Sequence, residues 1–235
     1  MAVNKVEYAG NILIDLTNDT VTPETLADGV TAHDKSGNLI TGTMQNGGEE
    51  NQIDKMLNGS IATINSNVNK IIGYGCYGIR TLVSVNLPEA TSIGTYAFRN
   101  CDNLASINAP KVTSLGTYAF YGTKITEAIF PFSATVPSNC FYTCSALTKA
   151  DFGAAKSIGG YSFYACAKLQ KLILRYTEAV VTVQSTSLTS SGIARGTGYV
   201  YVPSALIESY KTATNWSAYA EQFRAIEDYP DITGG

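Results

Sequence analysis

The feature that most constrains this chain is a short sequence unit repeated five times in its middle. The copies begin at Ile72, Ile93, Leu115, Val136 and Ile158, so that successive spacings are 21, 22, 21 and 22 residues. A repeat of about 20 to 30 residues is typical of a solenoid, because one unit is too small to bury its apolar face and must stack on its neighbours. The sequence therefore predicts a repeat solenoid.

Each copy carries an aromatic residue five positions after its opening aliphatic residue, followed by an apolar L-x-x-L-x-L series. The aromatic positions are Tyr77, Phe98, Phe120, Phe141 and Phe163. The last two apolar residues of each series alternate with polar ones, as they do in a short strand with one buried face. We therefore expect short parallel strands joined by aromatic-bearing turns of helical or irregular form, with the phenylalanines stacked in the core.

One copy reads I-G-x-x-A-F…C-x-x-L-x-x-I-x-x-P from Ile93 to Pro110. This phrase resembles the BspA-like (Treponema-type) leucine-rich repeats, and the resemblance covers residues 59 to about 226. It implies a leucine-rich-repeat-like solenoid and a non-catalytic surface or recognition protein.

Residues 1–44 do not repeat and predict a small β-rich N-terminal module. Ile12–Leu16 reads as a strand, and Thr22–Leu26 reads as an N-cap followed by one helical turn. Residues 30–33 and 38–44 flank a turn-forming segment, which predicts a hairpin.

The stretch from Leu26 to Met44 resembles a short module near the N-termini of bacteriophage and prophage structural proteins. This resemblance implies a virion appendage, such as a tail protein, that attaches to other virion proteins through residues 1–44 and forms a trimer. Residues 1–16 lack the pattern of a secretory signal, which agrees with a location in the phage particle. The alternatives are a bacterial cell-surface adhesin, which would need an export route, and a purely structural or decorating virion protein.

The segment after this module permits two interpretations. Residues 45–58 are polar at first and predict a linker, but from Ile53 to Ile71 the apolar residues are spaced as in an oligomerising helix. Gly59, three asparagines and β-branched residues oppose a helix, and favour an incomplete first repeat that caps the solenoid. We therefore assign the solenoid to residues 59–175.

Residues 176–235 predict an α/β C-terminal cap. Tyr199–Val202 reads as a strand, followed by one helix from Pro203 to Lys211 and another from Asn215 to Phe223. Trp216 is expected to plug the end of the core, although a lone tryptophan can also stack on a sugar.

Composition and isolated residues exclude several functions. The net charge of −3 and the absence of basic clusters predict no nucleic-acid partner, and the apolar stretches are too short for membrane insertion. The five cysteines recur at two repeat positions, which favours small buried residues over a disulfide or metal set. His33 is the only histidine, and a G-x-G-x-x-G match at residues 73–78 is explained by the repeat. We therefore expect neither a cofactor nor an enzyme.

Tyrosine is the residue type that most strongly indicates a binding surface, with fifteen copies in the chain. Two sets recur three residues apart and should share one face: Tyr96, Tyr118 and Tyr161, and then Tyr121, Tyr142 and Tyr164. These rings could bind a host-surface glycan or protein, or they could pack between neighbouring repeats. The strand surface is a second candidate, with Asn86, Asn108 and Asp151 among its variable outward positions, which also include Ile129 and Ile173.

Overall fold

The computed structural model describes residues 5–8, 11–15, 31–33, 39–41 and 62–233. The chain divides into two units, residues 1–57 and 58–235. In the first unit β1 (Lys5–Tyr8) pairs antiparallel with β2 (Asn11–Asp15), and β3 (Thr31–His33) pairs antiparallel with β4 (Leu39–Thr41). The predicted strand and hairpin are confirmed, and β1 was not predicted. The expected helical turn at Thr22–Leu26 and the linker at 45–58 lie outside the described residues.

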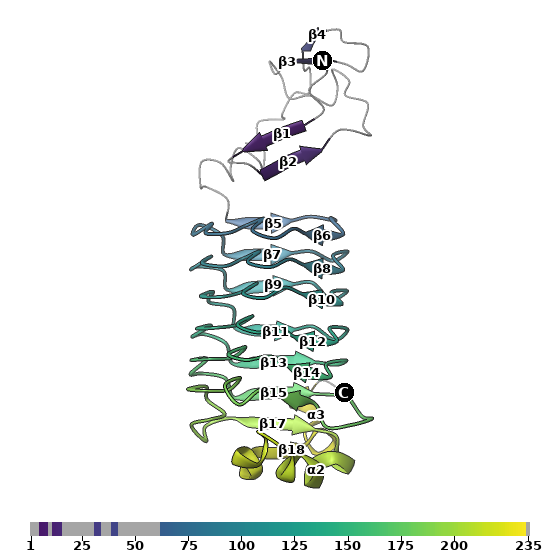
Figure 1. The fold of residues 1–235 in the computed structure, drawn as a ribbon, viewed down its shortest axis with the longest axis vertical. Coiled ribbons are helices and arrows are strands. Elements are labelled where there is room, and N and C mark those ends of the chain that lie inside the picture. Colours follow the sequence, from purple (N-terminus) through teal and green to yellow (C-terminus); the bar gives the residue numbers. More distant parts are fainter. Residues whose placement is uncertain (1–4, 9–10, 16–30, 34–38, 42–61, 234–235) are drawn as a thin grey trace. The chain divides into compact units, whose positions relative to one another are not determined.

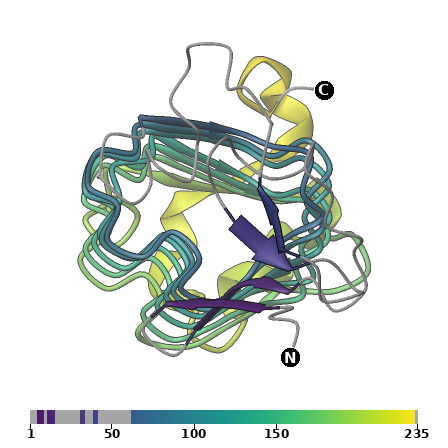
Figure 2. The same cartoon turned by 90° about the horizontal axis from the view of Figure 1, so that it is seen from above.

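The second unit is a parallel β-solenoid, in which successive turns lie on one another like rungs (Figure 1). One wall consists of the longer strands β5 (Thr63–Asn65), β7 (Ser84–Asn86), β9 (Ser106–Asn108), β11 (Glu127–Ile129), β13 (Lys149–Phe152), β15 (Lys171–Leu174), β17 (Tyr199–Val202) and β18 (Phe223–Ala225). A second wall consists of two-residue strands: β6 (Lys70–Ile71), β8 (Ser92–Ile93), β10 (Ser114–Leu115), β12 (Thr135–Val136), β14 (Ser157–Ile158) and β16 (Thr182–Val183). Seen along the axis, the turns superpose into a closed outline (Figure 2).

The strands at the start of this unit decide between the two interpretations of residues 53–71. β5 pairs in parallel with β7, and β6 pairs in parallel with β8. Residues 63–71 therefore form the first turn of the solenoid, and the alternative of an oligomerising helix is wrong there. Residues 53–61 lie outside the described ranges.

The first repeat has a different register from the one predicted. Ile71, rather than Ile72, pairs with Ile93, and Ile72 is 54 % exposed. The backbone N–H of Cys76 bonds to the carbonyl of Ala97 just as that of Phe98 bonds to Ala119, so Cys76 occupies the phenylalanine position. Tyr77 consequently lies on the surface instead of in the core, with 44 % exposure. Two adjacent isoleucines made both registers acceptable to a pattern of apolar residues.

The core is a column of stacked phenylalanine rings that runs through four turns. The centroids of Phe98 and Phe120 are 5.5 Å apart, those of Phe120 and Phe141 are 5.3 Å apart, and those of Phe141 and Phe163 are 5.5 Å apart. All four rings are fully buried. The predicted phenylalanine column is thus confirmed, with Leu188 occupying the equivalent buried position in the last turn.

The turns between the two walls are irregular, and none of those within the repeats is helical. Residues at the first tyrosine position adopt left-handed backbone, as Tyr96 (φ 61°), Tyr118 (φ 58°) and Tyr161 (φ 56°) show. The recurring glycine two residues earlier serves a different purpose, since a Cβ on Gly116 would lie 2.2 Å from the backbone nitrogen of Thr95 in the preceding turn. Close stacking therefore leaves no room for a side chain at Gly94, Gly116 and Gly159, whereas Pro137 stands at the same repeat position in the turn between the last two.

The five cysteines are free and buried, as predicted, although Cys76 occupies the phenylalanine position and not the position of Cys140 to which it was assigned. The thiols of Cys101, Cys144 and Cys166 donate to backbone carbonyls of the preceding turn over 2.9 to 3.1 Å. Burial raises the pKa of the Cys76 and Cys101 thiols to about 12, because the thiolate would be poorly solvated.

The solenoid extends beyond the predicted boundary at residue 175. β16 continues the parallel pairing from β14, and β17 continues it from β15, so a further turn precedes the cap. The cap contains a 3-10 turn at Ser204–Leu206, α2 (Ile207–Thr212), a 3-10 segment at Ser217–Gln222, β18, a 3-10 turn at Ile226–Asp228 and α3 (Pro230–Thr233). Trp216 is fully buried and its indole Nε1 donates to the carbonyl of Val181 over 2.6 Å, which confirms the core plug and removes the sugar-stacking alternative.

Candidate binding groove

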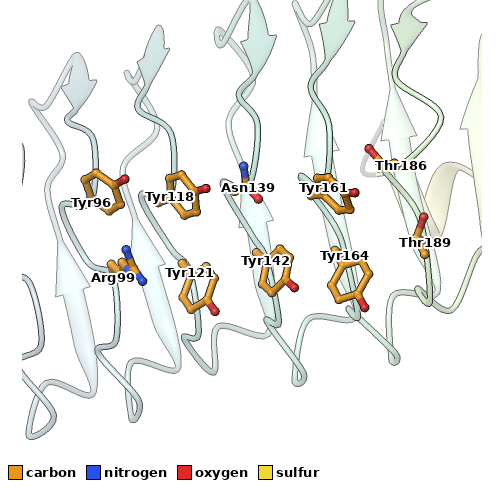
Figure 3. Close-up of a pocket in the computed structure, with 10 residues that line it drawn as sticks. All are labelled: Tyr96, Arg99, Tyr118, Tyr121, Asn139, Tyr142, Tyr161, Tyr164, Thr186 and Thr189. Atoms are coloured by element: carbon orange, nitrogen blue, oxygen red, sulfur yellow. The ribbon is translucent and has the colours of Figure 1, made fainter.

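Two rows of side chains run along one face of the solenoid, each turn contributing one residue to each row (Figure 3). The upper row consists of Tyr74, Tyr96, Tyr118, Asn139, Tyr161 and Thr186. The lower row, three residues later in each turn, consists of Tyr77, Arg99, Tyr121, Tyr142, Tyr164 and Thr189. The prediction that both tyrosine sets share one face is confirmed.

The turn geometry explains why these rows face outward. In the segment from Tyr118 to Tyr121, Ala119 and Phe120 are fully buried, whereas the two tyrosines are only partly buried. Left-handed backbone at the first position reverses the chain just before the phenylalanine enters the core. The same turn thus places one aromatic ring inside and two outside.

Within each row the rings stack on those of neighbouring turns. In the upper row Tyr74 and Tyr96 lie 4.7 Å apart, and Tyr96 and Tyr118 lie 4.9 Å apart. In the lower row Tyr121 and Tyr142 lie 4.9 Å apart, and Tyr142 and Tyr164 lie 4.6 Å apart. A ring in the middle of a row therefore has both faces covered and offers its edge and hydroxyl to solvent. Packing between repeats is therefore confirmed for Tyr96 and Tyr118 of the first set, whereas Tyr161 stacks on no ring of its row.

The rows also enclose a solvent-open groove of about 720 Å³. Its lining consists of Tyr96, Arg99, Tyr118, Tyr121, Asn139, Tyr142, Tyr161, Tyr164, Thr186 and Thr189. All six tyrosines predicted as binding residues are thus brought together in one groove. Its lining supplies aromatic edges, hydroxyls, one amide and one guanidinium, and it contains no carboxylate.

Arg99 replaces a tyrosine in the lower row and lies among four rings. Its Cζ is 4.8 Å from the ring centroid of Tyr121, 5.2 Å from that of Tyr96 and 5.5 Å from that of Tyr118, with Tyr77 at 5.9 Å. These distances are those of cation–π contacts. The Nε atom is buried without a hydrogen-bond partner among the described residues.

Asn139 replaces a tyrosine in the upper row and interrupts the stack. It retains the left-handed backbone of the position, with φ 59°. Tyr118 and Tyr161 flank it, one turn away on either side (Figure 3). The faces of these two rings that point along the row toward Asn139 are therefore not covered by another ring of that row.

The Tyr142 phenol lies among the other rings of the groove, and these neighbours affect its ionisation. The pKa of Tyr142 is raised above its ordinary value, first by desolvation among the neighbouring rings and then by repulsion from the other phenols, Tyr164 foremost. Arg99 is the only arginine, lysine, aspartate or glutamate among the lining residues.

The strand surface is less available than predicted. The amide of Asn108 donates to Asn86 Oδ1 over 2.7 Å, so these two outward residues bond to each other. The assignment of Asp151 as an accessible binding residue is wrong, because it is buried and accepts two hydrogen bonds from Arg175, at 2.8 and 3.0 Å. Ile173, the next outward residue, is also fully buried.

The C-terminal segment explains this burial. The next residue along this column of the sheet is Tyr201, which is 3 % exposed and meets the ring of Tyr229 edge-on at 5.5 Å. α3 follows directly and lies against the outer face of the strand wall near β15 and β17 (Figures 1 and 2). The folding back of this segment was not predicted.

Sequence reasoning missed several lining residues. Arg99, Asn139, Thr186 and Thr189 break the tyrosine pattern, so a search for recurring tyrosine passes over them. They could have been found from the register of the repeat, because any residue at either row position faces the groove, whatever its type. Thr186 and Thr189 were further hidden by a turn that is longer than the others, since β16 lies 25 residues after β14.

The described residues were also searched for metal sites and membrane-spanning helices. Within the described ranges, no group of three or more histidine, cysteine, aspartate or glutamate residues could hold a metal ion. The same part of the chain has no helix that is long and apolar enough to cross a membrane.

Comparison with known proteins identifies the repeat. The family model of the BspA-type leucine-rich repeat region matches residues 61–192 with six copies, which is more than half of the chain. A search of curated proteins found no significant match. Solenoids of leucine-rich repeats are typically binding scaffolds rather than enzymes, and the family suggests a surface-binding or adhesin-like role. Through its repeats and their register, this chain belongs to the BspA-type leucine-rich repeat family.

Proposed function

We propose that this chain is a recognition protein that binds a ligand on a cell surface in the groove between its two tyrosine rows. The observation that carries the proposal is the groove itself, a continuous strip of ring edges and hydroxyls contributed by consecutive turns. Tyrosine provides large contact area at a small cost in side-chain entropy, which is why it is abundant in binding sites. Membership of a family of binding scaffolds supports the same conclusion.

We further propose that the protein is a phage virion component, such as a tail or appendage protein, which residues 1–44 attach to other virion proteins. The support is the resemblance of Leu26–Met44 to the N-terminal module of phage structural proteins. The second candidate is a bacterial surface adhesin, which the BspA-type family match supports equally well.

The groove is tested with the full chain and two matched variants that each change one face. Tyr121→Ala with Tyr164→Ala removes two rings from the groove, whereas Asn86→Ala with Asn108→Ala alters the strand surface and leaves the groove intact. Binding of labelled protein to candidate host cells is then measured by flow cytometry. We expect at least a tenfold loss of binding for the groove variant only. A loss confined to the strand-surface variant would reject the groove as the recognition site.

The choice between a virion protein and a cell-surface adhesin is tested by finding where the protein is located. Immunogold labelling of purified phage particles should decorate an appendage if the virion proposal is correct. Labelling of washed, phage-free cells with no signal on particles would instead establish the adhesin.

A further inference from the structure

The two interruptions of the tyrosine rows point to the chemical class of the ligand. We propose that the groove binds an acidic polysaccharide, with one sugar ring inserted at Asn139 between Tyr118 and Tyr161 and a carboxylate bound by Arg99. This inference rests on the proposed function, since it specifies what the groove recognises.

The space at Asn139 has the dimensions of one ring. Adjacent turns of a β-solenoid are separated by about 4.8 Å, so Tyr118 and Tyr161, two turns apart, are separated by roughly 10 Å. This is twice the 4.6 to 4.9 Å at which rings stack elsewhere in the two rows. Asparagine is shorter than tyrosine, so the outer part of this position, beyond the Asn139 amide, has room for one ligand ring at the spacing of the row.

The walls of this space suit a sugar ring. Tyr118 stacks on Tyr96 on one side only, and Tyr161 is 43 % exposed and meets Tyr142 and Tyr164 at tilted or edge-on angles. A pyranose has an apolar face for contact with such rings and hydroxyls at its edge. The Asn139 side chain, which offers both a donor and an acceptor, lies between the two rings in the same row (Figure 3).

Arg99 supplies the preference for an acid. Among the described residues, its guanidinium makes no ion pair or hydrogen bond, and its neighbours are ring faces. A charged group without hydrogen-bond partners is costly to bury, and a carboxylate is the group that a guanidinium binds most specifically, through two parallel N–H···O bonds. The lining contains no acidic residue to compete with such a ligand.

The length and periodicity of the groove favour a polymer. Arg99 lies two turns from Asn139, or about 10 Å along the axis, and Thr186 and Thr189 continue the rows with hydroxyls beyond Tyr164. Hydroxyls repeated from turn to turn match a chain of repeating sugar units. An aromatic side chain of a protein could also enter the space at Asn139, but a single ring would leave the other turns of the groove unoccupied.

Two substitutions test the proposal without removing the fold, because each inserts the residue that neighbouring turns already carry. Asn139→Tyr completes the upper row, and Tyr96, Tyr118 and Tyr161 show that tyrosine accepts the left-handed backbone there. Arg99→Tyr completes the lower row between Tyr77 and Tyr121. Thermal unfolding should show that both variants are at least as cooperative as the unmodified chain.

The probes are an array of uronic-acid-containing and neutral bacterial polysaccharides, with each acidic binder re-tested after chemical reduction of its carboxylates to alcohols. We expect the full chain to bind acidic members and to lose at least tenfold in affinity after their reduction. Asn139→Tyr should lose at least tenfold toward every member. Arg99→Tyr should bind the acidic and the reduced forms equally.

Several outcomes would overturn this inference and leave the proposed function standing. They are equal binding of acidic and reduced glycans by the unmodified chain, unchanged binding by Asn139→Tyr, and binding to cells that protease treatment abolishes while no glycan on the array binds. Absence of binding to any cell would instead count against the proposed function itself.

Discussion

The solenoid carries two kinds of aromatic stack side by side, one inside and one outside, and they obey different constraints. The phenylalanine column has ring separations of 5.3 to 5.5 Å and interplanar angles of 4° to 12°. The tyrosine rows have separations of 4.6 to 4.9 Å and angles of 7° to 26°. The spacing of the turns sets both stacks, so the geometry alone does not separate a core from a binding surface.

What separates them is the type of residue that interrupts each stack. The inner column changes only to other buried residues, Cys76 in the first repeat and Leu188 in the last turn. The outer rows change to Arg99 and Asn139, whose polar groups would be costly to bury in a core. The interruptions therefore mark the outer rows as the surface on which specificity can be built while the inner column maintains the fold.

The strongest test of the difference between the two stacks is to truncate residues that are neighbours in the chain but belong to opposite stacks. The inner residue should show the larger effect on stability. Phe120→Ala leaves a cavity between Phe98 and Phe141 and should lower the free energy of unfolding by about 3 to 5 kcal/mol. Urea denaturation followed by circular dichroism measures this loss. Phe132→Ala is the control, because Phe132 is 58 % exposed and its truncation should change stability by about 0.5 kcal/mol or less. Similar losses for the two variants would contradict the assignment of the core.

The inner column could be read from the sequence because it recurs without ambiguity in four of the five predicted copies. The first copy failed, since Ile71 and Ile72 fit the pattern equally well and only the backbone pairing of Ile71 with Ile93 distinguishes them. The six tyrosines of the groove could also be predicted from the sequence, because they recur at fixed repeat positions. Arg99 and Asn139 were not, because a search for recurrence discards single departures.

The strand surface shows a different limit of sequence reasoning. Alternation placed Asp151 and Ile173 on the outer face of the sheet, and their pairing in register with Ile129 and Tyr201 confirms this position. Arg175 pairs with Asp151, and a segment more than fifty residues after Ile173 that does not repeat packs on Tyr201, the next residue of this column. No periodic pattern in the sequence predicts where such a segment will pack.

Alkaline pH should destabilise the solenoid through its buried thiols. The thiols of Cys76 and Cys101 have a pKa of about 12 in the fold, raised above the ordinary thiol value near 9 by burial. The folded state therefore retains these protons while the unfolded state loses them as pH rises above about 9. The contribution of these thiols to the free energy of unfolding is fully present below pH 9. Between pH 9 and pH 12 it should fall by about 1.4 kcal/mol per pH unit for each thiol.

Urea denaturation at pH 7, 9 and 10.5 measures this slope. Cys101→Ala provides the matched variant, because it removes one titrating thiol from the interior and should make the decline with pH shallower. A stability that stays level up to pH 10.5 would show that these thiols ionise in the fold as readily as outside it.

The outer stack should respond to truncation with a small loss of stability and a large loss of binding. Tyr121→Ala removes the stack on Tyr142 and the cation–π contact with Arg99, which together should contribute about 1 to 2 kcal/mol. Affinity for the cell-surface ligand should fall at least tenfold. The comparison with Phe120→Ala is direct because the two residues are adjacent in the chain. A stability loss equal to that of Phe120→Ala would place Tyr121 in the core rather than on a binding surface.

The smallest change separates the ring of a tyrosine from its hydroxyl. Tyr121→Phe retains the stack with Tyr142, so the free energy of unfolding should change by about 0.5 kcal/mol or less. Because a ring within the row exposes its edge rather than its face, a ligand in the groove should contact the hydroxyl, and its loss should weaken binding severalfold, as calorimetric titration would show. Unchanged affinity would mean that the rows act through ring edges alone. The distinction between the two stacks would then rest on Arg99 and Asn139, and the phenol hydroxyls would have no part in it.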